Sequence, residues 1–100
     1  MVLSEQIDAV NFRLRKSAAG YKSDWHVAGD PTLILIQKGI LRITLRNGDY
    51  RDFPAGSMFI AEDFLPHETS FDPAKHGHMA EVISDQELEA IHIKLCRISY

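Results

Sequence analysis

Hydrophobic and polar residues alternate with a period of two along much of this chain, which is the pattern of β-strands with one buried face. The alternation is clearest at residues 10–15 and 40–46. Further apolar segments that fit strands lie at 21–27, 32–38, 50–53, 57–61, 79–83 and 89–98. No segment sustains the period of an amphipathic helix. About eight short strands at a spacing of roughly 8–12 residues predict an all-β sandwich or barrel.

The segment 32–38 is apolar on both of its faces. Leu33 and Leu35 lie on one side of the expected strand, and Ile34 and Ile36 lie on the other. A strand of this kind is covered on both sides, yet one apolar face is enough for the core of a small barrel. We therefore expect a homodimer that uses the Leu33–Leu35 face, because a contiguous exposed apolar patch usually marks an interface.

Turn residues divide the chain between these strands. Asn47 and Gly48 predict a tight two-residue hairpin, because both residue types tolerate a positive φ. Residues 62–77 are rich in Pro, Asp, His and Gly and predict a loop, and residues 1–9 are expected to form a loose arm. No repeat or linker interrupts the chain, so residues 1–100 are expected to form a single domain.

Composition excludes several classes of partner. The chain has 100 residues, of which 45% are hydrophobic and 25% charged, as in an ordinary globular domain. Its net charge of −3 argues against a nucleic-acid partner. No apolar run approaches the roughly 18 residues of a membrane span, so no membrane partner is expected. The chain has one cysteine and begins without a signal-peptide pattern, which together predict a cytoplasmic location.

Two histidines stand at characteristic distances from two glycines. His26 lies thirteen residues before Gly39, and His67 lies eleven residues after Gly56. A small β-barrel can bring such imidazoles together from strands that are far apart in the sequence. Imidazoles that meet in an apolar cavity most often hold a metal ion.

With these residues the chain resembles the cupin family, which are small β-barrels of the jelly-roll type. Its first motif, G-x5-H-x-H-x(3–4)-E-x6-G, aligned on Gly39, has its first histidine at His26. The second histidine and the glutamate of that motif fall at Ala28 and Thr32. The second motif, G-x5-P-x-G-x2-H-x3-N, aligned on Gly56, has its histidine at His67. The resemblance covers about residues 21–96 and implies a cupin-type jelly-roll β-barrel for the chain.

A second alignment fits a subset of short bacterial cupins with a divergent first motif. In that subset Trp-His-x-Ala replaces His-x-His, and the chain has Trp25-His26-Val27-Ala28 at this place. The subset also has Glu-Asp and then Gly-His after the second glycine, and here these are Glu62-Asp63 and Gly77-His78. Under this alignment His78 takes the place of His67, and one sequence does not choose between the two.

The resemblance implies candidate site residues. The candidate metal ligands are His26, His67 and His78, and the residues expected to line a ligand cavity are Trp25, Thr32, Phe59 and Glu62. Zinc takes three or four protein ligands, and non-haem iron takes two histidines and a carboxylate. The sequence leaves open whether a divalent transition metal (Zn, Fe, Mn or Ni) or no cofactor is bound. His92 alternates out of phase with its apolar neighbours, and we assign it no role.

Three functions fit these observations. The first is a metal-dependent enzyme or binding protein that holds a small organic ligand in the barrel. The alternative is a metal-free small-molecule binding or sensor module, and the third is a structural dimer with no ligand. The sequence names neither a substrate nor a reaction, so it does not decide whether the protein is an enzyme.

Overall fold

The predicted all-β fold is confirmed, with seven strands where about eight were expected. The structure is a computed structural model and describes residues 1–66 and 68–96. Its strands are β1 (Ala9–Ser17), β2 (Thr32–Lys38), β3 (Ile40–Thr44), β4 (Tyr50–Pro54), β5 (Met58–Ala61), β6 (Met79–Val82) and β7 (Leu88–Leu95). Among the described residues no helix is long and apolar enough to cross a membrane.

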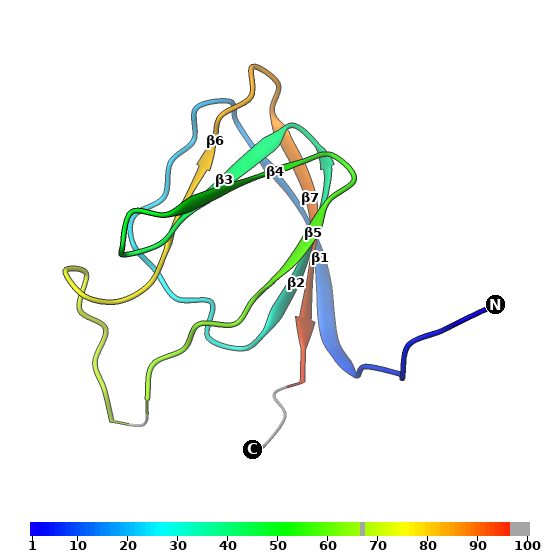
Figure 1. Cartoon of the computed structure of the whole chain (residues 1–100), viewed down its shortest axis with the longest axis horizontal. Helices are drawn as coiled ribbons and strands as arrows, with labels where there is room; N and C mark the ends of the chain where they lie inside the picture. The colour runs from blue at the N-terminus through cyan, green and yellow to red at the C-terminus, as the bar shows by residue number, and fades with distance from the viewer. Residues whose placement is uncertain (67, 97–100) are drawn as a thin grey trace.

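The strands form two antiparallel sheets that face each other (Figure 1). One sheet has the order β1-β7-β2-β5, and the other has the order β4-β3-β6. Apart from the β3–β4 hairpin, neighbours in the sheets are distant in sequence, as in a jelly roll. The side chains buried between the sheets are Ile34, Ile36, Leu41, Val82, Leu88 and Ala90. The N-terminal arm runs away from both sheets before β1 begins (Figure 1).

The segment 21–27 is not a regular strand, contrary to the sequence prediction. It runs antiparallel to β6 but forms only two isolated bridges, Lys22 with Glu81 and His26 with His78. The amide of Ser23 donates to the carbonyl of Ala80 at 2.8 Å between these bridges. Backbone hydrogen bonds thus link this segment to β6 at a few positions only. The segment lies beside β6 at the edge of the three-stranded sheet but is not a regular strand of it.

The hairpin between β3 and β4 is confirmed, but its turn is longer than predicted. Leu45 and Asp49 close the loop through the Leu45 amide, which donates to the Asp49 carbonyl at 2.8 Å. The Gly48 amide donates back to the Leu45 carbonyl at 3.0 Å. Gly48 has a φ of 90°, whereas Asn47 does not have a positive φ. This is a three-residue loop with a glycine in the left-handed region, not a two-residue turn.

The four-stranded sheet has one face toward the core and one face away from it. Ile34 and Ile36 of β2 are buried in the core. Leu33 and Leu35 point to the opposite side, since successive side chains of a strand alternate. Strand pairing brings eight apolar side chains together on that side in two rows, Phe12–Ile93–Leu33–Ile60 and Leu14–Ile91–Leu35–Met58. We call these eight residues the apolar outer face.

Candidate functional site

A cavity of about 280 Å³ lies between the two sheets. Its apolar wall is made by Ile34, Leu41, Ile43, Phe59, Ala80 and Leu88. Its polar side chains are three imidazoles, from His26, His78 and His92, together with Arg15, Tyr21, Ser17 and Ser23. An apolar pocket with a few convergent polar groups is the usual form of a small-molecule site.

The structure brings His26 and His78 together at this cavity. The backbone amide of each donates to the carbonyl of the other, at 2.9 and 2.8 Å. Their rings are tilted, with centroids 4.5 Å apart. His78 is buried, whereas His26 is exposed to solvent while it also lines the cavity. His26 therefore lies where the cavity meets solvent, and His78 lies further inside.

Gly77 makes this approach of the two backbones sterically feasible. A Cβ at residue 77 would lie 2.4 Å from the carbonyl oxygen of His26, closer than real atoms approach. Gly77 also has a φ of 88°, which side chains with a Cβ rarely adopt. The Gly77-His78 pair in the sequence thus has a structural reason, because the glycine allows the histidine to lie beside His26.

Both imidazoles are oriented through Nδ1. Nδ1 of His78 donates to Oδ2 of Asp63 at 2.8 Å, and Oδ1 of Asp63 accepts from the amide of Ala28 at 3.0 Å. Nδ1 of His26 donates to the carbonyl oxygen of Asp24 at 2.9 Å. Carboxylate and carbonyl oxygens only accept, so Nδ1 of each neutral ring carries the proton. Nε2 of each ring is then the acceptor available to a ligand.

The other predicted site residues lie in different places. Phe59 lines the cavity. Thr32 lines a smaller neighbouring hollow of about 170 Å³. The ring of Trp25 packs under the guanidinium of Arg46, 3.8 Å from ring centroid to Cζ, and Glu62 is exposed; neither lines the cavity. His67 lies outside the described residues.

Three site residues were missed by sequence reasoning. Asp63 appears in the sequence analysis only as part of the Glu62-Asp63 pair, and nothing local shows that it orients His78. His92 and Arg15 alternate with apolar neighbours, and the sequence does not show that the charged side of each strand faces inward. Burial lowers the pKa of His92 from its usual value, and the positive charge of Arg15 lowers this pKa further. His92 is therefore neutral at neutral pH.

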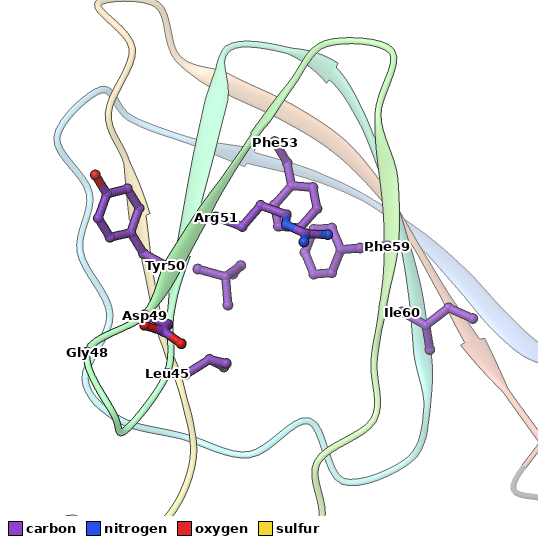
Figure 2. A pocket seen from close by; sticks show the side chains of 9 residues that line it. Leu45, Gly48, Asp49, Tyr50, Arg51, Phe53, Phe59 and Ile60 are labelled. Atoms are coloured by element: carbon purple, nitrogen blue, oxygen red, sulfur yellow. The ribbon is translucent and has the colours of Figure 1, made fainter.

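A second, more open hollow of about 680 Å³ lies between β4 and β5 (Figure 2). The rings of Phe53 and Phe59 meet in it, with centroids 4.1 Å apart. Tyr50 also lines it, and the Tyr50 ring packs against Arg42. No histidine is among the described residues that line this hollow. The cavity that holds the three imidazoles is thus the better candidate site.

The metal-ligand donors are fewer than a metal site needs. In the part of the chain that the structure describes, no group of three or more His, Cys, Asp or Glu side chains is placed to hold a metal ion. Ala28 and Thr32, at the other two ligand positions of the resembled motif, have neither an imidazole nor a carboxylate. Two imidazoles alone do not complete a zinc or non-haem iron site, so the described donors do not fit a resident metal ion.

Comparison with known proteins supports the fold. No family model and no curated protein matches the chain. Among solved structures, a cupin superfamily protein from Desulfitobacterium hafniense is 21% identical with a TM-score of 0.61, over 97% of this chain and 75% of that one. The Drosophila melanogaster CENP-C cupin domain is 15% identical with a TM-score of 0.59, over 85% of this chain and 56% of that one.

A third similar structure is the polyketide cyclase RemF from Streptomyces resistomycificus. It is 13% identical to this chain with a TM-score of 0.58, over 90% of this chain and 56% of that one. At such low identities the likeness shows the fold alone, and the chain has the cupin jelly-roll fold. Proteins with this fold differ in function, so the function of this chain has to be argued from its own site.

Proposed function

We propose that the protein binds a small organic ligand in the cavity between the sheets and needs no resident metal ion to do so. The observation that carries this proposal is the cavity itself: six apolar side chains form its wall, and polar groups converge on it from several segments of the chain. Burial of the apolar part of a ligand supplies affinity, and the polar groups supply orientation.

The two imidazoles give the ligand a defined polar contact. Asp63 and the Asp24 carbonyl hold Nδ1 of His78 and His26, so Nε2 of each ring accepts a hydrogen bond from a ligand hydroxyl or amine. The carboxylate of Asp63 also fixes the orientation of the His78 ring, which is how enzymes position an imidazole for proton transfer. The site therefore supports binding, and it also supports proton transfer if the ligand is a substrate.

A fragment screen with ligand-observed NMR tests this function. We expect fragments that bind wild-type protein to lose binding in Ala80→Phe, which fills the cavity, and to keep binding in Ala55→Phe, which adds the same ring at an exposed turn. Fragment binding that Ala80→Phe leaves unchanged would contradict the proposed site. Because Ala80→Phe can distort the sheet, chemical-shift changes at His78 and Ser23 in wild-type protein give a second measure of occupancy.

A metal-dependent function is the second candidate, and one observation favours it. Metal-binding histidines usually donate their other ring nitrogen to a carboxylate or carbonyl oxygen, and both His78 and His26 do so. Metal analysis of untagged protein separates the two candidates. A stoichiometric transition metal that His26→Ala removes would support the second candidate and overturn the metal-free proposal.

We also propose that the protein is a homodimer joined through the apolar outer face. Phe12, Leu14, Met58 and Ile60 of this face are 69%, 76%, 64% and 50% exposed in the single chain. A two-fold dimer buries the same patch on both copies, and it would cover side chains that no other part of the described chain covers. Light scattering at micromolar concentration should then report about twice the 11.3 kDa chain mass.

A further inference from the structure

The polar groups that line the cavity have one sign of charge. Arg15 is a permanent cation, and the remaining polar lining residues are imidazoles, a phenol and two hydroxyls. No Asp or Glu is among the described residues that line the cavity. The carboxylate of Asp63 stands behind His78, and both of its oxygens have donors. Arg15 is thus the charged side chain among these described lining residues, and because it is also exposed to solvent it puts a positive charge where the cavity opens, although the whole chain has a net charge of −3.

The charge of Arg15 is not neutralised within the described chain. Its Nε donates to Oγ of Ser17 at 3.2 Å, and its Cζ lies 5.6 Å from the centroid of the Tyr21 ring. These neutral groups hold the side chain in place without cancelling its charge. Among the described residues no carboxylate lies within ion-pair distance of Arg15, whereas Lys16, the next residue, pairs with Glu89 at 3.6 Å on the opposite face of the sheet.

A second hollow continues this positive surface along the inner face of β1 and β7. Arg13 pairs in register with His92, and both line the 170 Å³ hollow together with Lys94. His92 also lines the main cavity, so the two hollows adjoin. Lys94 pairs with Asp30 at 3.7 Å, and no carboxylate in the described part of the chain pairs with Arg13. Clustered charges of one sign raise the local concentration of ions of the opposite sign.

We propose that the ligand is a small organic acid whose carboxylate pairs with Arg15 and whose apolar body lies against the Phe59 side of the cavity. This inference rests on the proposed function and names its ligand class. The planar guanidinium matches a carboxylate with two parallel hydrogen bonds. His92, which is neutral, adds an N–H donor beside the carboxylate, and Arg13 lies on the way in from the smaller hollow. A neutral ligand would leave the Arg15 charge without a partner in the cavity.

The test compares acids with amides of the same shape. Benzoate, phenylacetate and hexanoate are titrated by calorimetry beside benzamide, phenylacetamide and hexanamide. We expect at least one acid to bind about tenfold or more tightly than its amide, with affinity that falls as salt is added. Arg15→Gln should weaken acid binding about tenfold and remove the difference between acid and amide. Arg15→Lys should keep part of it, because lysine has the charge but not the planar fork.

Lys16→Gln is the matched control, since it removes one positive charge from the adjacent residue on the opposite face of β1. Its acid affinity should equal that of wild-type protein. Amides that bind as tightly as acids, or acid binding that Arg15→Gln leaves unchanged, would overturn the organic-acid inference and leave the proposed function standing. If none of the six compounds binds while neutral fragments do occupy the cavity, the organic-acid inference is also overturned and the proposed function stands. No binding of any small molecule in the cavity would overturn both.

Discussion

The two faces of the four-stranded sheet differ, and at β1 they reverse the usual arrangement in which apolar side chains face inward and charged side chains face outward. On β2 both sides are apolar, and the side with Ile34 and Ile36 faces the core. On β1 the inward side holds Arg13 and Arg15, and the outward side holds apolar residues such as Phe12, which is 69% exposed. Both arginines are exposed to solvent, so these charged side chains can line a hollow without being desolvated. The reversal supports both proposals, a ligand on the inner face and a second subunit on the outer face.

The largest effect is expected from a charge on the outer face. Leu35→Asp should dissociate the proposed dimer, because its interface would bury an unpaired carboxylate at a cost of about 3 kcal/mol or more, over a hundredfold in dissociation constant. Light scattering should report the chain mass of 11.3 kDa. Ala55→Asp, which adds the same charge at the exposed turn between β4 and β5, should stay dimeric. A wild-type protein that is monomeric at these concentrations would contradict the proposed interface.

The next effect is expected at the backbone contact that forms the inner site. Gly77→Ala should destabilise the fold by about 2 kcal/mol or more, since it combines a strained φ with a clash against the His26 carbonyl. Gly20→Ala is the control, because Gly20 has a φ of 82° but a Cβ added there would meet nothing within 4 Å. Chemical denaturation measures both variants. Equal losses of stability in the two variants would show that only the strained φ matters and that the close contact with the His26 carbonyl does not.

A smaller effect separates the outer face from the core of the chain. Leu14→Ser should change the stability of the single chain by no more than about 0.5 kcal/mol, because Leu14 is 76% exposed. In a dimer the substitution should destabilise the interface by about 1.5 kcal/mol for each copy, because the apolar side chain of Leu14 is no longer buried there. Its melting temperature should therefore fall below that of wild-type protein at high protein concentration and match it at low concentration. A fall in melting temperature that does not depend on protein concentration would show that Leu14 stabilises the single chain and not a dimer.

The smallest effect concerns the inner face and pH. His92 has a lowered pKa in the folded chain because of burial and then Arg15, against 6.5 as its ordinary value. Below pH 6.5 the unfolded chain takes up a proton at His92 more readily than the folded chain does, so stability falls as pH falls from 6.5 through the folded pKa. His92→Gln should lose less stability than wild-type protein between about pH 7 and about pH 5, as measured by thermal melts in both buffers. Identical profiles of stability against pH would mean that burial and Arg15 do not lower the pKa of His92 in the folded chain.

Local sequence patterns determined most of the strands. The alternation at 10–15, the two-sided apolar segment at 32–38 and the glycine after Asn47 each predict an element that the structure contains. These features depend on neighbours in the chain, because a period of two and a tolerance for positive φ are properties of short segments. The irregular segment 21–27 was predicted as a strand because its residues fit one. Its intermittent pairing depends on β6, which lies about fifty residues or more away in the sequence.

The tertiary structure decided which face is inside and which residues meet. Alternation shows that His92 and Arg15 oppose apolar neighbours, but it does not say which side faces the second sheet, because that depends on how the sheets pack. The candidate ligands His26 and His78 were named from the sequence, yet their contact needed the close approach at Gly77 and the carboxylate of Asp63. Contacts of this kind join distant segments, so no local pattern records them. The sequence by itself determined a cupin-like barrel, and only the packing of its two sheets brought Arg15 and three imidazoles to one cavity.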